Sequence, residues 1–193
     1  MSNSLTLAIA GCTGRMGQAL VASAHGTPDV KLVAGSVRTG AHQHAAGLFV
    51  TSSPAILAEK AEAVIDFTTP EATIALAREV AKTGGIMIIG TTGFSDGQQK
   101  KLAECALTCR IVQAGNFSLG VNILESLVER AAKLLNEQYD IEINEMHHKH
   151  KKDAPSGTAL MLGRAAAKGR GVSLDSKKAI DRAGERKAGD IGF

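Results

Sequence analysis

The six residues at 147–152, His-His-Lys-His-Lys-Lys, are all histidine or lysine. Cations this close together repel one another, and the repulsion falls when an anion lies among them. A dicarboxylate would lower that repulsion and would be held in a fixed orientation. Histidine also exchanges protons near neutral pH. The run therefore predicts a site that binds a small dianion and transfers a proton.

The residues after this run predict a helix that starts at Pro155-Ser156-Gly157-Thr158. Amides in the first turn of a helix have no partner within it, so those of Gly157 and Thr158 are suited to a carboxylate. Two other interpretations stay open. His147 and His150, with Glu145, could ligate a metal, although a loop without an H-E-x-x-H helix argues against it. The run is otherwise typical of a solvated basic surface or a nucleic-acid patch.

Three glycines, in the pattern Gly11-x-x-Gly14-x-x-Gly17, follow the first apolar segment and open a helical pattern. Such a strand-to-helix turn needs positive φ and close approach of a ligand to its amides, and glycine allows both. The helix N-terminus adds partial positive charge, which favours a pyrophosphate. The last glycine lets the helix and strand pack closely. A glycine-rich turn without a ligand is the alternative.

The end of the second predicted strand indicates which dinucleotide binds. In many NAD sites a carboxylate at this point accepts hydrogen bonds from the adenosine ribose. Residues 35–39 are Gly-Ser-Val-Arg-Thr and contain no carboxylate. Arg38 can instead donate to a ribose 2′-phosphate. The stretch favours NADPH over NADH, with an ordinary solvated arginine as the alternative.

Two more turns follow predicted strands. Asp66-Phe67-Thr68-Thr69-Pro70 comes after the third strand, and Gly90-Thr91-Thr92-Gly93 comes after the fourth. Open α/β sheets bind ligands at the carboxyl ends of their strands. Each segment alone could be an ordinary turn. Together with the glycine pattern they outline one crevice, in which threonine hydroxyls could bond to a carboxamide or a ribose.

Strands and helices alternate along the first 116 residues. Several predicted strands are apolar on both faces, which is typical of a parallel sheet covered by helices on both sides. The sequence therefore predicts a doubly wound, Rossmann-like α/β domain. Its strands are expected at 5–10, 30–36, 63–67, 86–89 and 110–114, and its helices at 15–24, at 71–82 and from a Ser95 cap to about 107.

The pattern changes near residues 116 to 120, which predicts two domains, 1–116 and 117–193. The second domain is expected to be α+β. It should contain an amphipathic helix at 119–136, a half-exposed strand at 139–146 and an alanine-rich helix at 157–168. The tail after Gly169 is rich in Gly, Lys, Arg and Asp.

The composition argues against several classes of protein. Hydrophobic residues make up 44% and charged residues 21% of the chain, as in ordinary globular proteins. No apolar run is long enough to span a bilayer, and the N-terminus lacks the pattern of a signal peptide, so we expect a cytoplasmic protein. Its three cysteines are expected to be reduced thiols. Aromatic residues make up 3%, which gives little support to nucleic-acid binding.

Five motifs occur in order along the chain: Gly11-x-x-Gly14-Arg15-Met16-Gly17, Asp66-Phe67-Thr68-x-Pro70, Gly90-Thr91-Thr92-Gly93, Asn116-Phe117-Ser118-x-Gly120-Val121-Asn122 and His147-His148-x-His150-Lys151-x-Asp153-Ala154-Pro155-Ser156-Gly157-Thr158-Ala159. Their order and spacing resemble the 4-hydroxy-tetrahydrodipicolinate reductase family, also called dihydrodipicolinate reductase. The resemblance spans essentially the whole chain, and the last motif is the most specific.

The resemblance implies an oxidoreductase of lysine and diaminopimelate biosynthesis. The family reduces 4-hydroxy-tetrahydrodipicolinate to tetrahydrodipicolinate and water, with hydride from NADPH or NADH. The family's motifs imply that His147 and Lys151 transfer protons and that His148, Gly157 and Thr158 bind the carboxylates of the substrate. They also imply a cofactor site made of Gly11, Cys12, Thr13, Gly14, Arg15 and Met16 at the pyrophosphate, Arg38 at the NADP phosphate, and Gly90, Thr91, Thr92, Ala114, Gly115, Asn116 and Phe117 around the nicotinamide.

The sequence departs from the family in two places. Val37 stands where many members carry an acidic residue, which argues against tight use of NADH. Members also continue beyond Phe193, with more strands of a substrate-binding domain that builds a homotetramer. Without those strands the sheet would have exposed edges. We therefore expect an incomplete substrate-binding and oligomerisation domain, and a 193-residue chain that is poorly active or prone to aggregation rather than an active tetramer.

Other functions are kept as alternatives. A dinucleotide-binding sensor, or a truncated and inactive reductase, would keep the fold and lose the chemistry. Another two-domain reductase, resembling aspartate or homoserine dehydrogenase, would not need the His-His-x-His-Lys loop. A nucleic-acid binder would show a steep salt dependence of its affinity for DNA.

Overall fold

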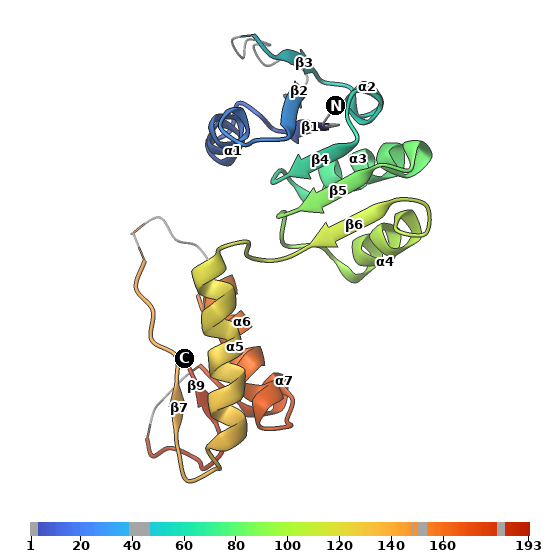
Figure 1. Cartoon of the computed structure of the whole chain (residues 1–193). Coiled ribbons are helices and arrows are strands. Elements are labelled where there is room, and N and C mark those ends of the chain that lie inside the picture. The colour runs from blue at the N-terminus through green and yellow to red at the C-terminus, as the bar shows by residue number, and fades with distance from the viewer. Residues whose placement is uncertain (1–3, 39–46, 148, 150–153, 181–183) are drawn as a thin grey trace. The chain divides into compact units, whose positions relative to one another are not determined.

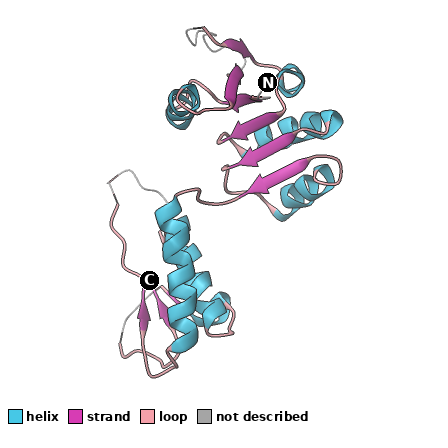
Figure 2. Ribbon diagram, in the orientation of Figure 1, coloured by secondary structure: helices cyan, strands magenta, loops and turns pink. Residues whose placement is uncertain are grey.

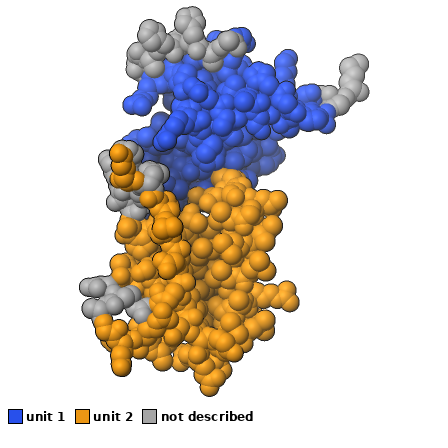
Figure 3. All heavy atoms as spheres, turned by 90° about the vertical axis from the view of Figure 1, so that its left-hand side faces the viewer, with its two compact units in different colours: residues 1–114 blue, residues 115–193 orange. Residues whose placement is uncertain are grey.

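The computed structural model describes residues 4–38, 47–147, 149, 154–180 and 184–193. The chain divides into two compact units, residues 1–114 and 115–193, which Figure 3 shows in blue and orange. The first unit ends two residues before the boundary predicted from the sequence.

Unit 1 is built around a sheet of six parallel strands in the order β3-β2-β1-β4-β5-β6 (Figure 1). The order reverses between β1 and β4, as it does in dinucleotide-binding folds. The predicted Rossmann-like fold class is confirmed. The strands are β1 Leu5–Ala10, β2 Val30–Ser36, β3 Phe49–Thr51, β4 Ala63–Asp66, β5 Ile86–Ile89 and β6 Arg110–Gln113.

Helices cover both faces of this sheet (Figure 2). Alternate residues of β1 point to opposite faces. Leu7 and Ile9 belong to the clusters beneath α1, whereas Ala8 and Ala10 belong to the core cluster beneath the other three helices. The helices of unit 1 are α1 Arg15–His25, α2 Pro54–Lys60, α3 Pro70–Thr83 and α4 Asp96–Cys105.

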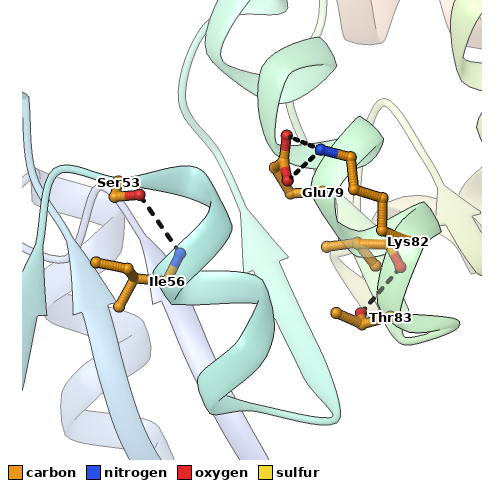
Figure 4. A network of polar contacts seen from close by, with 6 residues as sticks. Ser53, Ile56, Glu79, Lys82 and Thr83 are labelled. Atoms are coloured by element: carbon orange, nitrogen blue, oxygen red, sulfur yellow. Dashed lines mark hydrogen bonds and ion pairs between the residues drawn. The ribbon is translucent and has the colours of Figure 1, made fainter.

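Serine and threonine side chains begin several of these helices. Ser53 Oγ accepts a hydrogen bond from the amide of Ile56 at the start of α2 (Figure 4). At α4, Ser95 and Gln98 form a reciprocal capping box, so the predicted Ser95 cap is confirmed. Such caps satisfy amides that would otherwise have no partner.

Unit 2 packs two long helices, α5 Leu119–Leu134 and α6 Gly157–Gly169, against each other. Their backbones come close at Gly169, where an added Cβ would lie 2.3 Å from the carbonyl oxygen of Glu129. The buried core of unit 2 is made of Ala132, Ala166, Ala167, Leu174 and Ile191. The remaining elements are β7 Ile141–Glu142, the short helix α7 Leu174–Lys177, β8 Lys178–Ala179 and β9 Ile191–Gly192, with the parallel strand order β7-β9-β8.

The strand predicted at 139–146 was wrong in extent. Only Ile141 and Glu142 are assigned to β7, because its partner β9 is itself two residues long. The sequence pattern also missed β3, α2, α7, β8 and β9. Within the described residues, no helix combines the length and apolar character needed to cross a membrane.

Candidate functional site

The turns after three central strands lie together at one edge of the unit 1 sheet. Ala10 at the end of β1 pairs with Asp66 of β4, and Asp66 pairs with Ile89 of β5. The turns at 11–14 and 67–69 therefore flank the point where the strand order reverses, which is where such sheets bind ligands.

The glycine turn has the geometry that its sequence predicts. Gly11 has a φ of 68°, a value that side-chain-bearing residues rarely adopt. A Cβ added at Gly17 would lie 2.1 Å from the Gly11 carbonyl oxygen, so the turn and α1 are in backbone contact. The expectations of positive φ and close packing are confirmed.

Among the described helices, only α1 and the four-residue α7 start without a side-chain cap. Helices α2, α3, α4, α5 and α6 each have a serine or threonine side chain that accepts a first-turn amide. Helix α1 begins at Gly14 with no side-chain cap. Helix geometry leaves the Arg15 and Met16 amides without acceptors inside the helix, so they can bind an anion.

Cys12 lies beneath the turn rather than at its surface. Its side chain is 2% exposed, and its amide donates to the Ser36 carbonyl oxygen over 2.9 Å. Burial raises the pKa of the Cys12 thiol, which keeps the side chain uncharged beneath the glycine turn. A Cβ added at Gly35 would lie 2.6 Å from Cys12 Sγ. The Cys12 side chain thus serves packing, while Thr13, Gly14, Arg15 and Met16 are exposed.

Polar contacts link the turns after β4 and β5. The buried carboxylate of Asp66 accepts hydrogen bonds from the amide and the hydroxyl of Thr68, at 2.8 and 2.6 Å. A Cβ added at Gly11 would lie 2.9 Å from the methyl carbon of Thr68. These contacts fix Thr68 against the glycine turn.

The turn at 90–93 is held by α3 and by an aromatic ring. Thr73 of α3 donates its hydroxyl hydrogen to Thr91 Oγ1 over 3.0 Å, and both side chains are buried. A Cβ at Gly90 would overlap the ring of Phe67 at 2.0 Å. The hydroxyl of Thr91 is therefore engaged within the protein, whereas Thr92 is exposed.

Arg38 directly follows Val37, which is buried at the end of β2 and donates its amide to the Thr51 carbonyl oxygen. Because Val37 is anchored in this way, the backbone delivers Arg38 to the same edge of the sheet as the other turns. Its side chain is exposed. The position suits a residue that contacts the adenosine end of a dinucleotide.

The residues from Ala114 to Asn122 have two structural roles. The Ala114 amide bonds to the Ile89 carbonyl oxygen within unit 1. In unit 2, the Asn122 side chain donates to the carbonyl oxygens of Asn116 and Ser118, and Asn116 Oδ1 accepts the Ser118 amide. This local network defines the start of α5 and leaves Phe117 exposed.

The cationic loop is the segment 145–156, which contains the histidine and lysine run at 147–152. Its described part is built around Glu145. Its two carboxylate oxygens accept hydrogen bonds from the amide and the hydroxyl of Ser156, the amide contact being 2.7 Å. Glu145 Oε2 also lies 3.7 Å from His147 Nδ1. Ser156 is the buried N-cap of α6 and accepts the Ala159 amide over 3.1 Å. The segment from Glu145 to His147 and the start of α6 thus meet at one carboxylate.

Gly157 and Thr158 form the first turn of α6, as predicted, so their amides have no intrahelical acceptors. His148, His150 and Lys151 lie outside the described residues. In the described part of the chain, no group of three or more His, Cys, Asp or Glu side chains is arranged to hold a metal.

Sequence reasoning treated Glu145 only as a metal ligand and assigned no role to the Ser156 side chain. The two residues are eleven positions apart, and the contact between them depends on the tertiary fold. Two features of the sequence could have indicated this contact. Glu145 is a carboxylate two positions before His147, and Ser156 stands at a predicted helix start.

The chain matches two family models in sequence. Residues 5–117 match the model described as dihydrodipicolinate reductase, N-terminus, and residues 120–193 match the model described as dihydrodipicolinate reductase, C-terminus. A relative from Caulobacter vibrioides named 4-hydroxy-tetrahydrodipicolinate reductase is 50% identical over 200 residues, which cover 100% of this chain and 75% of the relative. A relative of the same name from Parvibaculum lavamentivorans is 44% identical over 208 residues, covering 100% and 77%.

A solved structure agrees with these matches. The dipicolinate-bound dihydrodipicolinate reductase from Paenisporosarcina sp. TG-14 superposes with a TM-score of 0.76 and 26% sequence identity, covering 95% of this chain and 71% of that one. The two family models together span nearly the whole sequence. The chain belongs to the dihydrodipicolinate reductase family.

Proposed function

We propose that the chain reduces 4-hydroxy-tetrahydrodipicolinate to tetrahydrodipicolinate with hydride from NADPH. The chain is a reductase of lysine and diaminopimelate biosynthesis by family membership. The proposal adds the preferred cofactor and the roles of individual residues. The observation that carries the dinucleotide site is the uncapped N-terminus of α1, directly after the glycine turn, and the exposed Arg38 after β2 supports the preference for NADPH.

The residues at this edge fit a dinucleotide. The first-turn amides at Arg15 and Met16 would donate to the pyrophosphate, while Gly11 and Gly14 keep side chains away from it. When bound, the nicotinamide supplies the hydride. Its half of the site would be lined by Gly90, Thr91, Thr92, Ala114, Gly115, Asn116 and Phe117.

Unit 2 would hold the substrate and transfer the proton. The amides of Gly157 and Thr158 would donate to one carboxylate, with His148 beside them. His147 and Lys151 would supply the proton and stabilise charge that develops on the ring nitrogen. The Paenisporosarcina relative binds dipicolinate, and this supports a small dicarboxylate as the substrate class.

Two further assignments belong to this proposal. Several large apolar side chains of α5 are exposed, including Leu119, Ile123 and Leu127, which supports assembly into an oligomer. Cys12, Cys105 and Cys109 are free thiols. Free thiols are typical of a reducing compartment, which supports a cytoplasmic location.

A coupled assay tests the proposed reaction. The synthase that makes the substrate is combined with this chain, and the absorbance of NADPH and NADH is followed in parallel. We expect consumption of reduced cofactor that depends on both proteins and is faster with NADPH. Cofactor binding without any consumption would instead favour a sensor or the truncated, inactive reductase.

Replacing Arg38 by alanine is expected to raise the KM for NADPH at least tenfold and to change the KM for NADH less than threefold. The side chain would lose charge-assisted hydrogen bonds to a phosphate that only NADPH carries, worth about 1.5 to 3 kcal/mol. Arg110→Ala is the matched control, because Arg110 is exposed at the opposite, amino-terminal end of β6. Equal effects on both cofactors would refute the role of Arg38.

A further inference from the structure

The carboxylate of Glu145 connects the proposed proton donor to the proposed carboxylate-binding helix. One oxygen, Oε1, accepts the Ser156 amide at 2.7 Å, and the other accepts the Ser156 hydroxyl. That second oxygen, Oε2, also lies 3.7 Å from His147 Nδ1. A single side chain therefore contacts both the N-cap of α6 and the imidazole ring.

Each end of this connection is fixed to a different degree. Ser156 is 3% exposed and is held by its hydrogen bond to the Ala159 amide, so the helix end is rigid. The side chains of His147 and Glu145 are 37% and 27% exposed. A half-exposed imidazole needs an external contact to keep one orientation, and the nearby carboxylate can provide it.

We propose that Glu145 is a positioning residue, which orients the His147 ring relative to the first turn of α6. Because Nδ1 faces Glu145, the opposite ring nitrogen, Nε2, is the one available to exchange a proton with the substrate. The negative charge of Glu145 also stabilises the imidazolium form during proton transfer. This inference rests on the proposed role of His147.

A purely structural role for Glu145 predicts different behaviour. If the carboxylate only supports the cap of α6, glutamine should replace it well, since the amide oxygen still accepts the Ser156 amide. If Glu145 acts on His147, the lost charge should reduce turnover although the helix start is preserved. The substitution E145Q therefore separates the two roles.

The test measures kcat and substrate KM in the coupled assay with saturating NADPH for E145Q, H147Q and the double variant. We expect E145Q to lower kcat about 10- to 100-fold, with substrate KM changed less than threefold. In the H147Q background, E145Q should cost less than threefold, because its partner is already gone. E142Q is the control, since Glu142 precedes the loop in β7 and pairs with Arg186 at 3.3 Å.

The outcomes separate this inference from the proposed function. If H147Q retains the kcat of the unmodified chain, the proposed role of His147 fails. If H147Q loses activity while E145Q matches the unmodified chain, Glu145 is not a positioning residue. A double variant that loses the product of the two single effects overturns the inference as well.

A second variant covers the case in which E145Q does not fold, as judged by thermal denaturation. S156A removes the hydroxyl that Glu145 binds and leaves the Glu145 and His147 side chains in place. The inference predicts that S156A lowers kcat at least threefold, because the carboxylate loses part of its anchor. An unchanged kcat in S156A overturns it.

Discussion

Replacing His147 by glutamine is expected to lower kcat at least 100-fold while leaving NADPH affinity within threefold of the unmodified chain. General acid–base catalysis by a side chain contributes about 10²- to 10⁴-fold, and glutamine cannot exchange a proton at neutral pH. NADPH affinity should persist because the glycine turn and the start of α1 belong entirely to unit 1. The measurement is kcat from the coupled assay, with NADPH fluorescence reporting binding.

His25→Gln is the matched control for this substitution. His25 is the last residue of α1, and its Nδ1 contacts the Val21 carbonyl oxygen at 2.7 Å, so glutamine there should leave kcat unchanged. In a non-catalytic sensor, H147Q and His25→Gln would both bind NADPH like the unmodified chain, and neither substitution would change cofactor consumption. Full turnover in H147Q would therefore remove His147 from the mechanism.

Replacing Gly17 by alanine is expected to destabilise unit 1 by about 3 kcal/mol, because it overpacks a tight contact. The new Cβ would lie 2.1 Å from the Gly11 carbonyl oxygen and 2.7 Å from Cys12 Cα. Both neighbours are backbone atoms, so the turn itself must shift. Since the shift moves the amides that we propose bind the pyrophosphate, NADPH affinity should also fall at least tenfold.

Urea denaturation followed by circular dichroism, together with NADPH titration, measures both effects. Gly97→Ala is the control, because no atom lies within 4 Å of a Cβ added there and alanine favours a helix. Gly97→Ala should leave NADPH binding unchanged and stability equal or higher. If Gly17→Ala matched this control, the close packing of α1 on its turn would have no energetic importance.

Unit 1 was largely predictable because its elements follow local rules. The bounds of β1, β2 and β5 agree with the apolar runs that predicted them, since parallel strands buried on both faces show continuous hydrophobicity. The segment from Phe49 to Lys60 was missed because β3 has three residues and α2 has seven. The signals of a serine cap and a proline at the helix start were present at Ser53 and Pro54.

Unit 2 was less predictable because its small sheet depends on contacts distant in sequence. Ile141 pairs with Ile191, fifty residues further along the chain. The tail is rich in charged and glycine residues, and its pattern does not reveal that Ile191 is fully buried. Glu145 lies where the alternating pattern predicted a strand, but its carboxylate bonds to the N-cap of α6.

The candidate site was predicted where steric requirements limit the residue type. Gly11 is needed for its positive φ, and Gly17 is needed because its backbone contacts the turn. Both requirements follow from the turn itself. Gly90 was placed in the ligand crevice because it follows a predicted strand, and the structure adds its close approach to the Phe67 ring. Side-chain contacts of this kind cannot be predicted from spacing alone.

The central claim is that the cationic loop of unit 2 receives a guest with two negative charges. Calorimetric titration of the NADPH-bound chain with dipicolinate, and separately with the monocarboxylate picolinate, tests it most directly. We predict that dipicolinate binds at least tenfold more tightly, because its second carboxylate gains charge-assisted hydrogen bonds. Equal affinities for the two compounds, or no binding of dipicolinate, would contradict the account.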